Sequence, residues 1–193
     1  MPATLSAHRP NPLGFLPVWQ RNFLVWRKMA IPAILGNLAD PLIYMLGLGY
    51  GLGAMLPSID GRPYVAFLAA GTVCASTMNA ATFEALYSAF SRMHVQKTWE
   101  AILNTPLGLA DVVAGELFWA ATKSLFSGAA ILVVITGMGL THGPLALWAL
   151  PAIVLTGLAF AALGLIWNAL APSYDFFMYY FTLFITPMTL ISG

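Results

Sequence analysis

The feature that most constrains this chain is a long run without a charged side chain. No Asp, Glu, Lys or Arg occurs from Ser124 to Tyr174, a stretch of 51 residues. A helix needs about 20 apolar residues to cross a lipid bilayer. The run is therefore long enough for two membrane spans, and we expect an integral membrane protein.

The composition of the whole chain supports this expectation. Only 8% of the residues are charged, compared with about 25% in soluble proteins, and 60% are hydrophobic, with a mean hydropathy of +0.81. The net charge of +1 and the scattered basic residues argue against nucleic-acid binding. The single cysteine, Cys74, excludes a disulfide framework within the chain, and we expect it to be buried.

Turn-forming and polar segments divide the apolar sequence into an all-α, polytopic helical bundle. Residues 15–28 are typical of an amphipathic helix lying at the membrane interface. The longest polar segment is a loop at 91–111, and it contains a short exposed helix at Thr98–Asn104. Five spans are expected, at about 31–56, 64–90, 112–140, 145–170 and 176–193.

The distribution of basic residues predicts the orientation of these spans. Four basic residues precede the first span and two lie in the loop at 91–111, namely Arg9, Arg21, Arg27, Lys28, Arg92 and Lys97. Short loops rich in Lys and Arg face the cytoplasm. The N-terminus and the loop at 91–111 are therefore expected on the cytoplasmic side of a multi-pass protein. Met1–Leu13 lacks the apolar region of a signal peptide.

Four glycines alternate along the end of the first predicted span, in the string GLGYGLG at 47–53. This string loosely matches a dinucleotide-binding fingerprint, which requires a preceding strand that the apolar span does not provide. Pairs of glycines four residues apart instead let another membrane helix approach closely. Helix packing is thus the better interpretation.

Four charged residues lie within or at the ends of predicted spans: Asp40, Glu84, Glu116 and Lys123. Such groups need partners, because an ionised side chain at the bilayer centre costs about 2.5–3.5 kcal/mol or more. Asp40 and Lys123 have similar depths in their spans, so we predict that they pair. The alternatives are a local helix break at Asp40, next to Pro41, and a Lys123–Glu116 pair on one helix face.

The fifth predicted span begins with a dense aromatic segment, since seven of the eleven residues from Tyr174 to Phe184 are aromatic. Such segments form belts at membrane interfaces, and they also suit the apolar faces of sugars and lipid tails. We consider Phe177, Tyr180 and Phe184 as candidates for a substrate path, with the interfacial belt as the alternative.

No motif of a known enzyme class is present, so we predict no catalytic, cofactor-binding or metal-binding residue in this chain. Without an ATP site, active transport requires an ATPase partner or a coupling ion. An ion-coupled secondary transporter, with Asp40, Glu84 and Lys123 as an ion relay, is an alternative from another functional class. The absence of an evident internal repeat weakens that alternative.

Several long strings of the sequence are similar to those of a known family. They include LGNLADPLIYMLGLGYGLG (35–53), FEALYSAFSRMHVQKTWEAILNTPL (83–107) and YDFFMYYFTLFITPMTLISG (174–193). Through them the chain resembles the ABC-2 type permeases, and among these most closely the nodulation protein J group. The resemblance covers nearly the whole chain from about Trp19.

This resemblance implies a permease homodimer in the inner membrane that works with two copies of an ATP-binding subunit similar to nodulation protein I. ATP would bind to that subunit, and no cofactor to this chain. The family's coupling helix corresponds to Thr98–Asn104, where Trp99, Glu100 and Leu103 are the candidate contacts to the ATPase. The alternative is a solvated loop without a partner.

The cargo implied by the resemblance is a lipo-chitin oligosaccharide, an acylated oligomer of N-acetylglucosamine. Another polysaccharide, another lipo-oligosaccharide or a hydrophobic drug is the alternative, because nothing in the spans specifies chitin length or acyl type. Family members have six spans, so we expect that this sequence ends before the sixth.

Overall fold

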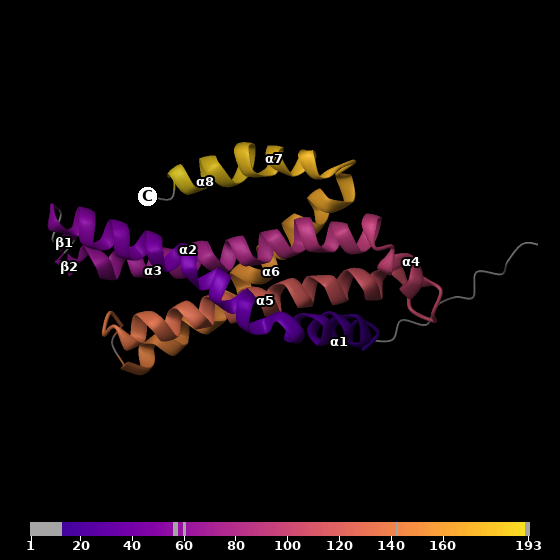
Figure 1. Cartoon of the computed structure of the whole chain (residues 1–193), viewed down its shortest axis with the longest axis horizontal. Coiled ribbons are helices and arrows are strands. Elements are labelled where there is room, and N and C mark those ends of the chain that lie inside the picture. The colour runs from indigo at the N-terminus through magenta and orange to yellow at the C-terminus, as the bar shows by residue number, and fades with distance from the viewer. Residues whose placement is uncertain (1–12, 56–57, 60, 142, 192–193) are drawn as a thin grey trace, which may run out of the picture.

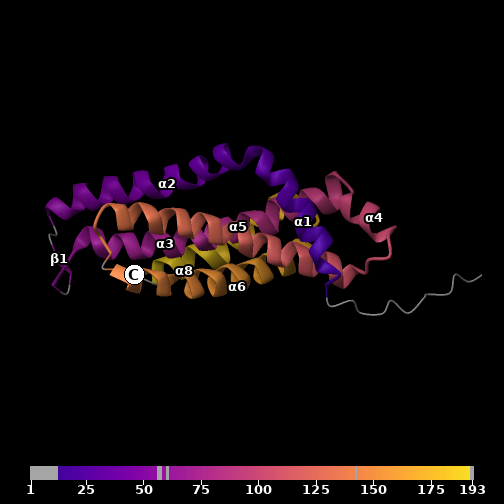
Figure 2. The same ribbon diagram turned by 90° about the horizontal axis from the view of Figure 1, so that it is seen from below.

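A computed structural model describes residues 13–55, 58–59, 61–141 and 143–191, with the side chains of Asp40, Ala54, Arg62 and residues 143–145 left out. The protein is an elongated bundle of helices (Figures 1 and 2). Four helices of the described part are long and apolar enough to cross a membrane: Phe15–Gly51, Tyr64–Val95, Leu109–Gly137 and Ala146–Leu170. The all-α, polytopic fold predicted from the sequence is therefore confirmed.

The first of these helices bends near its start. Helix α1 (Phe15–Trp26) ends in a 3₁₀ turn, η1 (Arg27–Met29), and α2 (Ala30–Gly51) follows without a loop and runs into η2 (Leu52–Ala54). Figure 1 shows α1 beside the start of α5 at one end of the bundle, while α2 runs toward the other end. The predicted interfacial segment at 15–28 thus forms a separate helical piece, and its position relative to a bilayer stays a prediction.

A small hairpin connects α2 to α3 at the opposite end of the bundle from α4 (Figure 1). Strands β1 (Ser58–Ile59) and β2 (Arg62–Pro63) pair antiparallel, with Ser58 opposite Pro63. Gly61 has a φ of +76°, which favours glycine because it has no Cβ. The turn expected between the first two spans is therefore a hairpin.

Helix α3 (Tyr64–Phe83) continues past its predicted end at residue 90. Two wider π-helical turns, η3 (Glu84–Ser88) and η4 (Ser91–Val95), extend it to Val95. Lys97 then has a φ of +52°, and this left-handed residue turns the chain into α4 (Thr98–Leu103). The predicted loop at 91–111 therefore begins with a helical segment, and α4 is one residue shorter than expected.

Helices α3, α5 (Leu109–Gly137) and α6 (Ala149–Leu170) form the centre of the bundle, with η5 (Gly143–Trp148) leading into α6. Small residues allow the close contacts. A Cβ added at Gly164 of α6 would lie 2.7 Å from the Cβ of Ala85, and one added at Gly128 of α5 would lie 2.9 Å from Ile153. Together with Gly157 of α6, which faces Ser124 of α5, these glycines mark close crossings of the three central helices.

Two of the four glycines in the GLGYGLG string pack against another helix of this chain. Gly49 and Gly53 face α3, where an added Cβ would lie 3.3 Å from Val65 and 3.7 Å from Tyr64, respectively. Gly47 and Gly51 have no described atom within 4 Å of such a Cβ. The expected close approach is thus present on one glycine row.

The last described segment is a broken helix made of η6 (Tyr174–Phe176), α7 (Phe177–Tyr180), the π-helical η7 (Phe181–Ile185) and α8 (Thr186–Ile191). It corresponds to the fifth predicted span, and it is not among the four long apolar helices. Both views show it running back along the bundle from the α4 end (Figures 1 and 2). The count of five spans stays a prediction.

Candidate functional site

Four charged side chains meet inside the bundle between α3, its π-helical extension and α5. Arg92 Nη2 donates to Glu84 Oε1 at 2.8 Å, and Arg92 Nε donates to Glu116 Oε1 at 2.9 Å. Lys123 Nζ donates to Glu84 Oε2 at 2.6 Å. We call Glu84, Arg92, Glu116 and Lys123 the charge network. Its two acids balance its two bases.

Three of the four members of the network are deeply buried. Glu84 and Glu116 are 3% and 2% exposed, and Arg92 is 9% exposed. Trp119 Nε1 donates a further hydrogen bond of 2.8 Å to Glu84 Oε1. Buried charges are tolerated when they are paired and when hydrogen bonds satisfy their remaining atoms. Glu84, Arg92 and Glu116 meet that condition, and the partly exposed Lys123 is joined to them through Glu84, so the four residues form one interdependent unit.

The π-helical turns explain how Glu84 and Arg92 reach each other. In a regular α-helix, residues eight apart are about 80° out of alignment around the axis. The wider turns of η3 and η4 change this spacing, and the two side chains form an ion pair on the same helix. Asn168 of α6 supports η3, because its Nδ2 donates to the carbonyl of Ala85 at 2.8 Å. Such π-turns are frequent at functional sites.

Helix α4 is attached to the network through one side chain. Trp99 is 7% exposed, and its Nε1 donates to Glu116 Oε1 at 3.2 Å. The same ring packs with Val18 of α1 and Val112 of α5. In contrast, Glu100 and Leu103 are exposed, with Glu100 contacting only Lys97, at 3.9 Å, among the described charged groups. One face of α4 thus holds the bundle and the other faces outward.

Helix α1 also lies against this assembly. Arg21 Nη2 donates to Thr98 Oγ1 at 3.4 Å, and Trp19 Nε1 donates to Thr122 Oγ1 at 3.0 Å. Gly115 of α5 makes the crossing possible, since an added Cβ there would lie 2.5 Å from Val18. Helix α1 therefore forms one packed end of the bundle with α4 and the start of α5, which lie far from it in sequence.

The structure distributes the predicted charged residues differently from the sequence interpretation. Lys123 pairs with Glu84, and the Lys123–Glu116 pair that we kept as an alternative is replaced by contacts of Glu116 with Arg92 and Trp99. The side chain of Asp40 lies outside the described residues, so the predicted Asp40–Lys123 pair stays a prediction. Pro41 lies inside the continuous helix α2.

Sequence reasoning missed Arg92 and Trp119. Arg92 was assigned to the loop because the second span was expected to end at residue 90. Counted from the observed helix ends, Glu84 lies 11 residues from Val95 and Lys123 lies 14 residues from Leu109. At 1.5 Å per residue this difference is about 4.5 Å, well within the reach of a lysine side chain. A correct helix end would therefore have predicted the Glu84–Lys123 pair.

The aromatic candidates of the last segment differ in accessibility. Phe177 and Tyr180 are fully buried in a cluster with Leu86 and Phe90 of the α3 extension. Phe184 is 37% exposed and stacks on Tyr180. Only Phe184 of the three has a substantial surface in this conformation, and a role in a substrate path stays a prediction for all of them.

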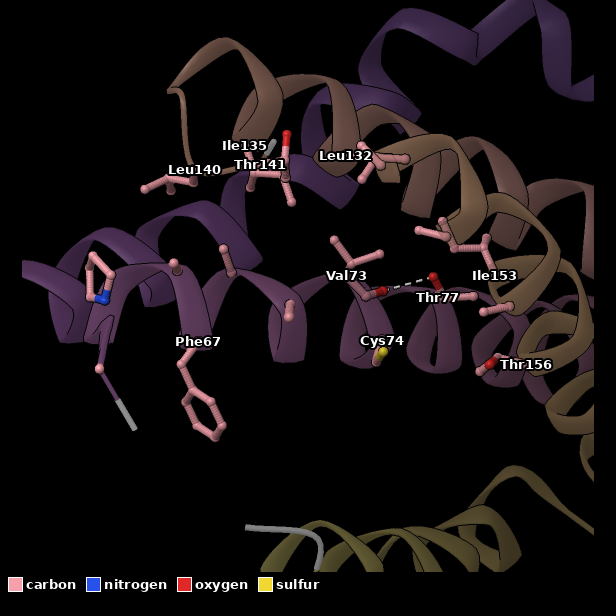
Figure 3. Close-up of a pocket in the computed structure, with 18 residues that line it drawn as sticks. Phe67, Val73, Cys74, Thr77, Leu132, Ile135, Leu140, Thr141, Ile153 and Thr156 are labelled. Atoms are coloured by element: carbon pink, nitrogen blue, oxygen red, sulfur yellow. Dashed lines mark hydrogen bonds between the residues drawn. The ribbon is translucent and has the colours of Figure 1, made fainter. Parts of the chain in front are cut away.

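Two cavities lie away from α4. The larger, about 840 Å³, is an apolar space between α3, the end of α5 and the start of α6 (Figure 3). Val73, Leu132 and Ile153 line it, and Cys74 is exposed there rather than buried as expected. The smaller, about 190 Å³, lies between α2, α3 and α5 and includes Lys123 in its lining. The charge network thus borders a cavity.

Within the described ranges, no cluster of three or more His, Cys, Asp or Glu side chains is arranged to hold a metal ion. The site consists of a surface helix, its buried anchor and a set of ion pairs that link two long apolar helices.

Comparison with known proteins identifies the family. The ABC-2 type transporter family model matches residues 15–193. Nodulation protein J of Rhizobium leguminosarum bv. viciae is 56% identical over 191 residues, covering 99% of this chain and 73% of the relative. Nodulation protein J of Rhizobium meliloti (strain 1021) is 55% identical over 189 residues, covering 98% and 72%.

A more distant relative is the inner membrane transport permease YadH of Escherichia coli (strain K12), which is 22% identical over 180 residues, covering 91% of this chain and 68% of the relative. No solved structure matches the chain. The family match spans the four apolar helices, the charge network and α4 together, and the two nodulation proteins match over nearly the same length. The chain therefore belongs to the ABC-2 type transporter family, as a multi-pass membrane permease of the nodulation protein J group.

Proposed function

We propose that this protein is the membrane subunit of an ATP-driven exporter that moves lipo-chitin oligosaccharides across the bacterial inner membrane. The observation that carries the proposal is the similarity to nodulation protein J over nearly the whole chain. Two copies of the permease would work with two copies of an ATP-binding subunit similar to nodulation protein I. ATP would bind to that subunit, and the N-terminus and α4 would lie on the cytoplasmic side.

In this proposal α4 is the helix that receives the motion of the ATPase. Its exposed side chains, Glu100 and Leu103, are available for contact with a partner. Its buried side chain, Trp99, is held by Glu116 and by packing against Val112. A push on α4 would therefore act directly on α5 instead of being absorbed by a flexible loop.

The charge network would carry that displacement further. Glu116 and Lys123 belong to α5, whereas Glu84 and Arg92 both belong to the π-helical extension of α3. Two ion pairs, Arg92–Glu116 and Lys123–Glu84, join this extension to α5, and the Arg92–Glu84 pair lies within the extension. Because a buried charge cannot lose its partner without a large penalty, these elements would move together. Phe177, Tyr180 and Phe184 on the adjacent broken helix would line or gate the cargo path at a later stage of the cycle.

The test is ATP-dependent uptake of labelled lipo-chitin oligosaccharide into inside-out membrane vesicles that contain the permease and its ATP-binding subunit. Two matched variants each remove an exposed leucine side chain. Leu103→Ala changes a residue of α4 that is 42% exposed, and Leu109→Ala changes the first residue of α5, which is 57% exposed. Leu103→Ala is expected to lower uptake about tenfold, because it removes one residue of the contact with the ATPase. Leu109→Ala is expected to leave uptake unchanged.

Three other outcomes would contradict parts of the proposal. Equal effects of the two variants would remove α4 as the ATPase contact. ATPase activity in the assembled complex without uptake of this cargo would keep the exporter and exclude lipo-chitin oligosaccharides. Uptake driven by a proton gradient without the ATP-binding subunit would replace the exporter with an ion-coupled transporter.

A further inference from the structure

We propose that the small cavity between α2, α3 and α5 binds one sugar unit of the cargo, and that Lys123 links this cavity to the charge network. The inference rests on the proposed function for the identity of the cargo. It goes beyond that function because it assigns a binding site, its residues and a route by which cargo binding is felt at α4.

The cavity lies at mid-length of the apolar helices. Among the described side chains, the polar ones that line it are Asn37, Ser76, Asn79, Lys123 and Ser127. Lys123 is the middle residue of α5, and Asn79 lies at the middle of the continuous helix Tyr64–Val95. If these helices cross the membrane centrally, the five polar side chains lie near the centre of the bilayer. Polar side chains at this depth normally face protein, water or a transported substrate.

Several polar groups of the cavity lack partners within the described part of the chain. The amides of Asn37 and Asn79 form no hydrogen bond there. Pro41 has no N–H, so the Asn37 carbonyl loses the donor that a regular α-helix would supply. Hydrocarbon cannot satisfy these groups. A polar occupant would satisfy them, and it would explain why apolar helices carry amides at this depth.

The chemistry of the lining favours a neutral, hydroxyl-bearing occupant. Asn37 and Asn79 each offer both donors and an acceptor, and Ser76 and Ser127 share one hydrogen bond of 2.8 Å, which leaves a hydroxyl hydrogen free. The ammonium group of Lys123 is already paired with Glu84, so it supplies a donor without an unbalanced charge. An N-acetylglucosamine unit carries hydroxyl groups and an amide, which match this mixture.

The size and the apolar wall of the cavity fit the same ligand. Its volume of about 190 Å³ equals that of about six water molecules in the liquid, which suits one sugar ring. Phe83 also lines the cavity and is 50% exposed. An aromatic ring provides a flat apolar surface for the C–H face of a sugar.

Contacts lead from this cavity to α4 without a break. Lys123 binds Glu84, Glu84 binds Arg92, Arg92 binds Glu116, and Glu116 accepts from Trp99 of α4. A sugar that takes a hydrogen bond from Lys123 would weaken or shift its contact with Glu84. Coupling between two sites is reciprocal. If cargo binding favours one position of α4, then a displacement of α4 by the ATPase changes the affinity for the cargo by the same factor.

The first experiment separates cargo binding from the rest of transport. Asn79→Leu and Asn37→Leu remove the amides at nearly constant size, and Thr72→Val is the control, since the Thr72 hydroxyl bonds within α3 to the Leu68 carbonyl. In the vesicle assay, loss of one or two hydrogen bonds is expected to raise the KM for the cargo about tenfold in each Asn variant and to leave Thr72→Val unchanged. A fall in maximal rate with an unchanged KM would overturn the assignment.

The second experiment detects the site without transport. Asn79→Cys is made together with Cys74→Ser and treated with a water-soluble thiol reagent, with and without the N-acetylglucosamine tetramer. Thr105→Cys in the same background is the control, because Thr105 is exposed in the turn that follows α4 and does not line the cavity. The tetramer is expected to slow modification at position 79 at least threefold and not at position 105.

Each outcome of this labelling has one meaning. Modification at position 79 without protection identifies a water-filled cavity and overturns the proposal. The absence of modification identifies a closed contact, for example with a second copy of the chain, and overturns it as well. Protection in a protein that shows no uptake of lipo-chitin oligosaccharide would keep the sugar site and reject the proposed function.

Discussion

The two ends of this bundle are built from the same long helices, yet they are held together differently. At the α4 end, ion pairs and the indole group of Trp119 join the extension of α3 to α5, and the indole group of Trp99 joins α4 to α5. At the hairpin end, the same two helices meet α6 through apolar side chains around a cavity of about 840 Å³ (Figure 3). One end is specified by partners and the other by packing alone.

This difference indicates how the molecule divides its work. Buried ion pairs are demanding, because each group must keep its particular partner, so the α4 end has few alternative arrangements. Apolar side chains beside a cavity can repack among rotamers with a small change in free energy. A rigid end that receives a displacement and a deformable end that changes shape are the two parts that a transporter needs.

The strongest way to break the contrast is to remove the centre of the charge network. Glu84→Leu leaves Lys123 without its carboxylate and takes one of two acids from Arg92. Breaking a buried pair costs about 3–5 kcal/mol, so we expect that decrease in the free energy of unfolding, measured by denaturant titration in detergent. Glu100→Leu, on the exposed face of α4, is the control, with an expected change below about 1 kcal/mol.

A double variant tests whether the network behaves as a unit. Glu84→Leu combined with Lys123→Leu removes both partners of one pair. Its loss of stability is expected to be smaller than the sum of the two single losses by about 1–3 kcal/mol. Additive losses would show that the pairs are independent, and the description of this end as one interdependent unit would be wrong.

A second way to break the contrast acts on the backbone of the α4 end. Asn168→Leu keeps the approximate size of a buried side chain and removes the donor to the Ala85 carbonyl in the η3 turn. An unsatisfied buried carbonyl costs about 1–3 kcal/mol. We expect a decrease in the free energy of unfolding within this range, together with faster hydrogen exchange in residues 84–95. Thr72→Val, whose hydroxyl bonds within α3 to the Leu68 carbonyl, should change neither quantity.

The same regional difference decides what could be read from the sequence. The length of the apolar segments predicted the membrane-spanning helices, because a run of about twenty or more apolar residues is typical of a helix that crosses a bilayer. The need of Glu84, Glu116 and Lys123 for partners was also predictable from their surroundings. The identity of those partners was not, because π-helical turns have no clear signature in sequence, and without η4 Arg92 is placed in a loop.

Helix α4 illustrates the same limit on a smaller scale. The polar composition of its segment and the resemblance to ABC-2 permeases indicated a short helix with Trp99, Glu100 and Leu103 as contacts. Sequence alone could not say that Trp99 faces inward to Glu116, while Glu100 and Leu103 face outward. The orientation of a six-residue helix depends on what it packs against, and here the acceptor lies 17 residues further along the chain.

The smallest expected effect sharpens the contrast from the apolar end. Ile131 and Ile135 lie one turn apart on α5, are 0% and 3% exposed, and belong to the same apolar cluster, but only Ile135 lines the large cavity. Ile→Val in a packed core costs about 0.5–1.5 kcal/mol, and the value depends on how well neighbours can fill the space. The Ile135 side chain already lacks neighbours on the side that faces the cavity, so the loss of one methyl group there removes fewer contacts. Ile135→Val is therefore expected to lower the free energy of unfolding by at most about 0.5 kcal/mol, and Ile131→Val by about 1.5 kcal/mol. Both values are measured by the same denaturant titration. Equal losses would mean that the cavity is filled in the folded protein, and the hairpin end would then be as closely packed as the α4 end.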